Sequence, residues 1–406
     1  MNIDQQVAYL MRGAEYGDPE TRKSMEEELR ERLLESERTG RPLCVYCGYD
    51  PRTSDLHIGH TVTMRKLRQF QELGHQVIFV IGTYTALIGD PSDKDKLRAQ
   101  LTQEEAKRNA ESYAEQAFRI LDREKTQVRF NAEWLSDLTF KELIQLASNF
   151  TIQQFMTRLN FRKRWETDEA VYFHEFFYAL MQGYDAYALD ADVQVGGTDQ
   201  MFNIMTAARK IMAYYGKKPN IGIILGILPG TDGEVKMSKS LGNHIPLNTL
   251  PEDMFGKVMS IPDKAMSSYA RLVTRWSMEK IYAFEKAIES GEMHPRDAKM
   301  DLAEEITSAF FDAEQASSAR KHFITLFQKG DMPEVMPEFP AAGEIALIDA
   351  LTASGTVQSG SQVRRLVTQN GVKVDGEKVT DPFLPLAPGN VIQVGKRRFL
   401  KIVEQG

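Results

Sequence analysis

Two short clusters of side chains in this sequence have the right chemistry to hold a nucleotide polyphosphate. The first is His-Ile-Gly-His at residues 57–60, where we expect two imidazoles and the N-terminus of a helix to face an anion together. The second is Lys-Met-Ser-Lys-Ser at residues 236–240, which offers two ammonium groups and two hydroxyls to a polyphosphate that loses pyrophosphate. Either motif alone is weak evidence, whereas both together, in this order, predict a nucleotide site.

A loop after the apolar run at residues 77–82 carries further candidate groups. Asp90 lies in Gly-Asp-Pro-Ser at residues 89–92, a segment typical of turns, and Lys94 and Arg98 come just downstream. Cations are expected near a bound pyrophosphate. An ordinary turn followed by a solvated charged helix is an equally good interpretation of these residues by themselves.

A third cluster is polar and lies in an otherwise apolar stretch. Tyr178, Gln182 and Asp185 are spaced by four and three residues, so one face of a helix carries all three. A buried Asp or Gln requires hydrogen-bonding partners, which a ligand with complementary groups supplies. The alternative is an exposed polar face, but the other faces of this stretch are almost entirely apolar.

Gly-Gly-Thr-Asp-Gln at residues 196–200 follows an apolar run and opens another helical stretch. Its glycines permit close approach of a backbone or ligand, and Asp199 is placed to hold ribose hydroxyls. A Gly-Gly turn by itself would be weak evidence.

Alternating strands and helices must position these clusters. We predict strands at residues 43–47, 77–82, 192–195 and 221–228, and helices at 57–73, 103–122, 139–148, 173–190 and 200–215, with Asp55 as the N-cap of the first of these helices. This alternation predicts an α/β fold with a parallel sheet and helices on both faces. Ligands in such folds bind at the carboxyl ends of the strands, where the candidate groups lie.

The remaining parts of the chain have different patterns. Residues 1–40 predict two helices broken at Gly-Asp-Pro, and residues 251–328 predict several amphipathic helices. Residues 329–342 hold three prolines and indicate a linker. The last part is β-rich, with Asn370-Gly371 and Asp375-Gly376 as turn signals.

Length and charge limit the class of protein. A chain of 406 residues is expected to hold two or three domains. Its net charge of −7 argues against non-specific coating of nucleic acid. Residues 341–406 nevertheless carry eight Lys/Arg and six Asp/Glu, a net charge of +2, which indicates an anionic partner for this tail.

The two cysteines are Cys44 and Cys47. Their spacing is compatible with a redox or zinc site, but a structural zinc needs four ligands and no second pair exists, so small apolar residues of a buried strand are the better interpretation. The low cysteine count suits a reducing cytosol. No signal peptide and no apolar stretch near ~18 residues is visible, so we expect a cytoplasmic protein without a membrane span.

Taken together, these segments resemble the tyrosyl-tRNA synthetases, a family of Rossmann-type aminoacyl-tRNA synthetases. The similarity includes Tyr-Cys-Gly-Tyr-Asp-Pro at residues 46–51, Leu-Ile-Gly-Asp-Pro-Ser at 87–92, the polar face of the 173–190 helix and residues 196–200. It covers the whole chain and implies three domains. These are a Rossmann-like catalytic domain with N-terminal helices at 1–230, an α-helical tRNA-binding (anticodon-binding) domain at 231–328 and, after a linker at 329–342, a small α+β RNA-binding domain at 343–406.

The resemblance implies activation of L-tyrosine by ATP, with release of pyrophosphate, and transfer of tyrosine to the 3′ end of tRNA(Tyr). It further implies a homodimer, and Mg²⁺ is expected with the pyrophosphate. No covalent enzyme intermediate is needed, because positioning and charge stabilisation carry this reaction.

The resemblance also assigns site residues one position at a time. The substrate phenol would be bound by Tyr46 and Asp185, its ammonium by Asp90, Tyr178 and Gln182, and its carboxylate by Gln200. The nucleotide would be bound by Cys47, Gly48, Asp50, His57, Gly59, His60, Thr63, Gly197, Asp199, Lys236, Met237, Ser238 and Lys239. The catalytic set would be His57, His60, Lys94, Arg98, Lys236 and Lys239. Of these, His60 would touch the ribose together with Cys47, and the others would face the phosphates.

Two positions depart from the family pattern. Arg52 stands where the family usually has threonine, with Thr53 next to it, so the γ-phosphate contact of that threonine is in question. Asp93 stands where the family usually has glycine, which affects how its loop approaches the nucleotide. Neither change falls in the amino-acid pocket.

The tail resembles the small RNA-binding domain first known from a ribosomal small-subunit protein. Residues 360–367 and 370–376 match its helix and hairpin. This similarity implies that Arg364, Arg365 and Lys373 contact RNA phosphates. The alternative is an ordinary β-rich accessory domain with a solvated basic face.

Two competing functions stay open on the sequence. A related synthetase with tryptophan as substrate is disfavoured, because Tyr46 and Asp185 together suit a phenol better than an indole. An RNA-binding paralogue without aminoacylation activity is disfavoured by the intact motifs at 57–60 and 236–240 and by Asp90. Stabilisation of the fold by ATP plus tyrosine would separate the second alternative from an enzyme.

Overall fold

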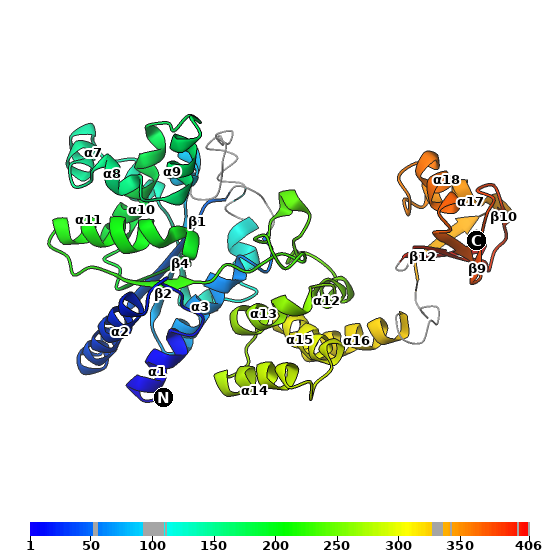
Figure 1. Ribbon diagram of the computed structural model, residues 1–406, viewed down its shortest axis with the longest axis horizontal. Coiled ribbons are helices and arrows are strands. Elements are labelled where there is room, and N and C mark those ends of the chain that lie inside the picture. The colour runs from blue at the N-terminus through cyan, green and yellow to red at the C-terminus, as the bar shows by residue number, and fades with distance from the viewer. Residues whose placement is uncertain are drawn as a thin grey trace. The chain divides into compact units, whose positions relative to one another are not determined.

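The structure is a computed structural model that describes residues 1–51, 56–91, 109, 112–326, 336–341, 343–395 and 398–404 (Figure 1). The chain divides into two compact units, Met1–Ser317 and Ser318–Gly406. Each unit has a sheet and a hydrophobic core of its own.

A five-stranded parallel sheet forms the centre of the larger unit. Its strands are β1 (Cys44–Tyr49), β2 (Gln76–Ile81), β3 (Thr126–Phe130), β4 (Val193–Gly197) and β5 (Ile221–Leu225), in the order β3-β2-β1-β4-β5. The order reverses between β1 and β4, which is where folds of this kind bind ligands. The parallel sheet confirms the predicted α/β class.

All four predicted strands are present, although β5 ends at Leu225 and not at residue 228. The fifth strand, β3, was not predicted. It lies at the edge of the sheet, and none of its five residues is buried. An edge strand of this kind has no continuous apolar run by which its sequence could be recognised.

Helices surround this sheet in the larger unit (Figure 1). Those before residue 215 are α1 (Ile3–Leu10), α2 (Pro19–Thr39), α3 (Thr61–Glu72), α4 (Thr85–Ile88), η2 (Arg123–Lys125), α6 (Ala132–Leu135), α7 (Phe140–Ala147), α8 (Ile152–Phe155), α9 (Leu159–Glu166), α10 (His174–Ala188), η3 (Thr198–Gln200), η4 (Phe202–Ala208) and α11 (Arg209–Tyr214). The predicted helices at 139–148 and 173–190 are confirmed as α7 and α10. Of the helix predicted at 103–122, residues 112–117 are helical and residues 118–120 form a turn.

The predicted break between the two N-terminal helices is confirmed, and local chemistry explains it. The Asp18 side chain accepts a hydrogen bond from the Thr21 amide at 2.7 Å, and Pro19 occupies the first helical position of α2. Gly40, with φ of 71°, ends α2 in a left-handed conformation.

The helix predicted from residue 57 begins at Thr61 instead, so that prediction was wrong at its start. Residues 57–60 form a bridge and a turn before α3, because His57 pairs with Pro246 and the Ile58 amide donates to the Ile245 carbonyl at 3.0 Å. A tertiary contact with a segment far along the chain therefore fixes this motif, and the sequence pattern could not reveal it. Asp55, the predicted N-cap, lies outside the described residues.

The helical stretch predicted at 200–215 is confirmed but is not uniform. It starts as the 3₁₀ turn η3, widens into the π-helix η4 and continues as the α-helix α11. π-Helical turns are rare and occur frequently at functional sites.

The helices predicted after Pro251 are confirmed as far as residue 326. With the 3₁₀ turn η5 (Lys239–Leu241) before them, they are α12 (Pro251–Met259), η6 (Asp263–Ala265), α13 (Met266–Val273), α14 (Met278–Glu289), α15 (Pro295–Phe310) and α16 (Ala313–Ile324). Their buried faces carry apolar residues such as Phe255, Tyr269 and Ile306.

The smaller unit is the predicted α+β tail. It contains β6 (Glu338–Ala341), β7 (Ile345–Ala346), α17 (Leu347–Ala353), α18 (Gly360–Thr368), β8 (Val372–Val374), β9 (Glu377–Lys378), β10 (Pro385–Leu386), β11 (Val391–Val394) and β12 (Arg398–Glu404). Strands pair in the orders β6-β12-β11-β8-β9 and β10-β7. Asp375 and Gly376, with φ of 51° and 87°, form the predicted two-residue turn between β8 and β9.

No helix within the described ranges is long and apolar enough to cross a membrane.

Candidate active site

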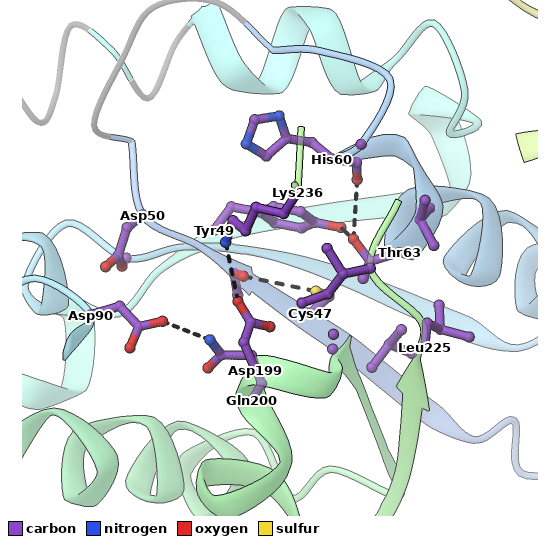
Figure 2. Close-up of a pocket in the computed structure, with 18 of the residues that line it drawn as sticks. Cys47, Tyr49, Asp50, His60, Thr63, Asp90, Asp199, Gln200, Leu225 and Lys236 are labelled. Carbon is purple, nitrogen blue, oxygen red and sulfur yellow. Dashed lines mark hydrogen bonds and ion pairs between the residues drawn. The ribbon is translucent and has the colours of Figure 1, made fainter. Parts of the chain in front are cut away.

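A pocket of about 570 Å³ opens at the carboxyl ends of β1, β4 and β5, beside the switch in strand order (Figure 2). Its walls come mainly from residues 47–50, 57–63, 80–90, 178–200 and 225–240, so the sheet brings together the segments that the sequence singled out. A cavity of this size is typical of a small-molecule site.

Most of the predicted site residues line this pocket. They are Cys47, Gly48, Asp50, His57, Gly59, His60, Thr63, Asp90, Tyr178, Gln182, Asp185, Gly197, Asp199, Gln200, Lys236, Met237, Ser238 and Lys239. Tyr46 lies one layer behind them: its ring has no exposed surface, and its hydroxyl is 3.5 Å from the Gln182 carbonyl oxygen. Lys94 and Arg98, together with Arg52, Thr53 and Asp93, lie outside the described residues.

The histidines stand together at one end of the pocket. The rings of His57 and His60 are 3.8 Å apart between centroids, and that of His244 is 6.2 Å from His57. Burial, and then the neighbouring His60, His244 and Lys236, lower the pKa of His57 to about 2. His57 is therefore a neutral imidazole at physiological pH, so it offers hydrogen-bonding nitrogens to the pocket and no positive charge.

The lysine motif lies across the pocket from the sheet. The Lys236 ammonium is 3.5 Å from the Asp199 carboxylate, which joins the motif to the segment after β4 (Figure 2). Met237 is buried and anchors the segment, while Lys236 and Lys239 line the cavity on either side of it. The two lysines thus face the space in which a polyphosphate would lie.

Asp50, at the end of β1, organises the middle of the pocket. It accepts hydrogen bonds from the Tyr178 hydroxyl at 3.0 Å and from the Thr85 hydroxyl at 2.7 Å. Gly82 is required beside it, because a Cβ atom at this position would lie 2.2 Å from the Asp50 carboxylate. The glycine therefore serves a close approach of two segments.

Asp185, on α10, is a buried carboxyl in the lining of the same pocket. It accepts a hydrogen bond from the Trp134 indole at 2.7 Å and a longer one from the Asn131 amide at 3.4 Å. Burial, and to a smaller extent the nearby Asp50, raises the pKa of Asp185 to about 8 in spite of these donors. Such a group fits one specific polar atom of a ligand in an otherwise apolar recess.

Asp90 and Gln200 are joined across the pocket floor. The Gln200 amide nitrogen donates to the Asp90 carboxylate at 2.6 Å (Figure 2). This contact holds the Asp90 carboxylate in the lining of the pocket, where it adds a negative charge.

Sequence reasoning missed Asn131 and Trp134, which hold Asp185, and Asn203, which lies behind Gln200. Asn131 follows directly after β3, so recognition of that strand would have placed this residue at the same sheet edge as the other site residues. No local pattern marks the other two.

The basic residues predicted in the tail lie on two neighbouring elements. Arg364 and Arg365 are exposed on α18, and Lys373 on β8 stands directly opposite Lys378 on β9. Like charges in such a cross-strand pair are unfavourable, and a bound anion would relieve the repulsion.

Comparison with known proteins agrees with this arrangement. Residues 38–328 match the family of tRNA synthetases class I (W and Y), and residues 347–392 match the S4 domain. The tyrosine–tRNA ligase of Moorella thermoacetica is 45% identical over 403 residues, covering 98% of this chain and 97% of its own. That of Haemophilus influenzae is 47% identical over 372 residues, covering 91% and 92%.

Solved structures share the fold at lower identity. A C-terminally truncated mitochondrial tyrosyl-tRNA synthetase of Aspergillus nidulans has a TM-score of 0.63 at 21% identity and covers 80% of this chain and 94% of its own. The tyrosyl-tRNA synthetase of Archaeoglobus fulgidus in complex with L-tyrosine has a TM-score of 0.62 at 24% identity and covers 78% and 99%.

The two motifs meet in one pocket at the switch point of a Rossmann-like sheet, and the similarity to the curated relatives extends over nearly the whole chain. The chain belongs to the tyrosine–tRNA ligase family, within the class I tRNA synthetases, and carries a C-terminal S4 domain.

Proposed function

We propose that this chain activates L-tyrosine with ATP to form tyrosyl-adenylate and pyrophosphate, and then transfers tyrosine to the 3′ end of tRNA(Tyr). The observation that carries the choice of amino acid is the buried Asp185 in the pocket lining, held by Trp134. The lysines of residues 236–240, which line the same pocket, supply the phosphate site.

Tyrosine is selected by its hydroxyl. Asp185 accepts a hydrogen bond from the phenol, and Tyr46 supports the same recess from behind. When phenylalanine binds, Asp185 is left buried without this partner, which costs free energy. The tyrosine enzymes are themselves an established example of this kind of discrimination. An indole fits less well, because its single N–H is not at the position of a phenol oxygen.

The amino and carboxyl groups of tyrosine lie toward the middle of the pocket. Asp90, Tyr178 and Gln182 receive the ammonium, and Gln200 faces the carboxylate. This arrangement directs the carboxylate oxygen at the α-phosphorus of ATP, so that proximity and orientation account for much of the rate.

ATP extends from the glycines after β1 and β4 toward the two motifs. The ribose is surrounded by Cys47, Gly48, His60, Thr63, Gly197 and Asp199, and the phosphates by His57, Gly59 and the lysines. Lys94 and Arg98 belong to the phosphate site by family resemblance. Closure of the 236–240 segment on the triphosphate stabilises the charge of the departing pyrophosphate.

Mg²⁺ enters with the nucleotide in this proposal. The ammonium groups of Lys236 and Lys239 at the phosphate end fit phosphate oxygens and would repel a divalent cation, so a metal ion would be held there by the phosphates of the nucleotide. Mg²⁺ commonly binds through substrate phosphates and water, and its role is to neutralise charge on the leaving group.

Tyrosine-dependent ATP–pyrophosphate exchange tests this function, with tryptophan and phenylalanine run beside tyrosine. We expect exchange with tyrosine alone and its loss in Asp185→Ala. Asp137→Ala, which removes an exposed carboxylate shortly after Trp134, is the matched control and is expected to leave exchange intact. Exchange with tryptophan instead of tyrosine, or none with any amino acid from folded protein, would contradict the proposal.

The domain boundaries follow from the same proposal. Residues 1–230 form the catalytic domain, and residues 231–328 form the segment with the lysine motif and the helical anticodon-binding domain. The linker predicted at 329–342 was wrong at its end, because β6 (Glu338–Ala341) pairs with β12 and so belongs to the sheet of the RNA-binding domain predicted at 343–406. The free, buried cysteines support a cytoplasmic location.

We also propose that two copies of the chain associate through the surface of α7, α8, α9 and the start of α10. Large apolar side chains are exposed there, including Phe140 at 78%, Leu159 at 75%, Trp165 at 70% and Phe173 at 68%. So many exposed apolar groups on consecutive helices are typical of a subunit interface. A second copy of the same surface would cover them.

Sedimentation equilibrium tests the dimer. Wild-type protein is expected to sediment as a dimer, and Trp165→Glu with Phe173→Glu as a monomer. Phe383→Glu changes a side chain that is 55% exposed in the smaller unit and is expected to keep the dimer. A monomeric wild type would refute this part of the proposal.

A further inference from the structure

Asn203 does not line the pocket, yet it joins two glutamines that do. Its side-chain amide nitrogen donates to the Oε1 atom of Gln182 at 2.9 Å and to the Oε1 atom of Gln200 at 2.9 Å. Only 1% of Asn203 is exposed. It therefore touches the pocket only through these two neighbours.

The orientation of all three amides follows from Asp90. A carboxylate only accepts hydrogen bonds, so Gln200 must turn its nitrogen toward Asp90, at 2.6 Å. The Oε1 atom of Gln200 then faces Asn203, whose side-chain nitrogen must donate the hydrogen bond between them. The second hydrogen of that nitrogen binds Gln182, so the polarity of Asp90 is transmitted along the chain of amides.

Two backbone features make this arrangement possible. Asn203 lies in the π-helix η4, directly after the 3₁₀ turn that carries Gln200, and the change in helix type brings the two side chains together three residues apart. Gly183 on α10 lets η4 approach closely, because a Cβ atom there would lie 3.1 Å from the Ala207 backbone. Gln182, its neighbour in the chain, is thereby within reach of Asn203.

We propose that Asn203 is a positioning residue, which fixes the amides of Gln182 and Gln200 so that their polar atoms suit the amino and carboxyl groups of the amino-acid substrate. This inference rests on the proposed function. It assigns to Asn203 the affinity for the common part of the amino acid, and not the choice between side chains, which belongs to Asp185.

The arrangement explains why an asparagine is needed at this position. Aspartate has the same shape but only accepts hydrogen bonds when ionised, so both glutamines would have to turn over. Gln200 would then present its oxygen to Asp90, and the two acceptors would repel each other. Loss of the donor therefore disturbs the pocket even though the volume of the side chain is preserved.

Asn220 provides a matched control. It has no exposed surface, and its side chain donates to Gln194, which does not line the pocket, at 3.4 Å. Among the described residues, Asn203 and Asn220 both have an Oδ1 atom without a hydrogen-bond partner. Aspartate at either position buries a carboxyl group, but only at 203 does the change reach the substrate groups.

Steady-state ATP–pyrophosphate exchange on the full chain is the test. Asn203→Asp and Asn203→Ala are expected to raise KM for tyrosine by about tenfold or more, with a smaller effect on KM for ATP. Asn220→Asp is expected to lower the melting temperature without changing either KM. The alanine variant keeps the test valid if Asn203→Asp does not fold.

A second comparison excludes a merely structural role. In a background with Gln182→Ala and Gln200→Ala, the further change Asn203→Ala should have little additional effect on KM, since its partners are gone. An unchanged KM in both Asn203 variants, or an equal effect with and without the glutamines, overturns the inference while exchange by the wild type still supports the proposed function. Absence of exchange in the wild type would instead refute the proposed function.

Discussion

At the scale of single residues, we propose that Asp185 decides which amino acid the pocket selects. It is a buried carboxyl whose pKa is raised to about 8, so above that pH it is an ionised hydrogen-bond acceptor shielded from water. A hydrogen bond between a phenol and an ionised group in such a place is worth about 1.5–3 kcal/mol. Trp134 holds this acceptor in position at 2.7 Å.

Asp185→Asn should therefore reduce the selectivity for tyrosine over phenylalanine more than it reduces the stability of the fold. Above pH 8, we expect kcat/KM for tyrosine in pyrophosphate exchange to fall about ten- to a hundredfold, whereas the value for phenylalanine changes little. Asp137→Asn is the control for an exposed carboxyl. Equal losses for both amino acids would show that Asp185 does not contact the phenol.

The same residue predicts a dependence of stability on pH. The pKa of Asp185 rises from 3.8 to about 8 on folding, so the folded chain binds a proton that the unfolded chain has released between these values. The contribution of Asp185 to stability is thus complete below about pH 4 and is lost as pH rises through about 8.

Melting temperatures from pH 4 to pH 8 test this contribution. Relative to Asp185→Asn, which does not titrate, the wild type should lose stability as pH rises, by up to about 1.4 kcal/mol per pH unit in this window. A constant difference between the two proteins would contradict the raised pKa.

Which residues could be predicted depended on whether their signal was local. Tyr178, Gln182 and Asp185 are on one helix, so their spacing placed them together on the pocket wall. Trp134 contacts Asp185, and Asn203 contacts Gln182, so both partners are distant in the sequence. Asn203 also contacts Gln200 across the change from a 3₁₀ turn to a π-helix. No pattern in the sequence brings Asn203 or Trp134 to the site. The neutral state of His57 likewise depends on burial, which appears only in the folded chain.

At the scale of elements, the lysine segment owes its shape to Asn243. The Oδ1 atom of the Asn243 side chain accepts a hydrogen bond from the Ser238 backbone amide at 2.8 Å. Its Nδ2 atom donates to the Asp232 carboxylate at 2.6 Å and to the Lys236 backbone carbonyl at 3.2 Å. The segment is thus closed on itself by one side chain. Gly230 is required because a Cβ atom there would lie 2.2 Å from Asn243.

Asn243→Ala should disturb the positions of the lysines more than the amino-acid pocket. We expect kcat for exchange to fall by about tenfold, because two hydrogen bonds that hold the segment are lost, with little change in KM for tyrosine. Asn390→Ala is a close control: Asn390 donates to Asp375 at 2.6 Å and accepts from Ala387 at 2.7 Å in the smaller unit. If both variants were equally active, Asn243 would have no part in catalysis.

The elements themselves were predictable where burial dictates the pattern. The strands β1, β2, β4 and β5 are largely buried and have apolar runs, whereas β3 is half-exposed and lacks one. The motif at residues 57–60 was placed inside a helix, but pairing of His57 with Pro246 holds it in a turn before α3. The sequence also could not predict that η4 is a π-helix, since a π-helix and an α-helix have similar sequence patterns.

At the scale of the whole molecule, buried cations join the sheet-bearing part of the larger unit to its helices. The Arg12 guanidinium donates to the carbonyls of Arg271 and Thr274 at the end of α13, the latter at 3.0 Å. Lys66 on α3 donates to the Arg12 carbonyl at 3.0 Å. Cations at helix C-termini are favourable, so the N-terminal helices link the pocket to the helical region.

The smaller unit has a separate core, formed by residues such as Leu347, Val363 and Ile392, so changes on its surface should leave the pocket intact. Its net positive charge and the opposed lysines Lys373 and Lys378 suit a polyanion. Arg364 adds a flat cation, which lies 5.6 Å from the ring of Phe383. We therefore assign the affinity for tRNA in part to this face.

Arg364→Ala combined with Lys373→Ala should weaken tRNA binding and leave pyrophosphate exchange unchanged. Fewer counterions are released on binding when a phosphate contact is lost. The plot of the logarithm of the tRNA association constant against the logarithm of the salt concentration should therefore become shallower by about 0.7–0.9 per lost contact. Lys23→Ala, which removes a charge that is 77% exposed on α2, is the control and should not change the slope. An unchanged slope in the double variant would place the tRNA elsewhere, because a face that binds phosphates cannot lose two cations without this effect.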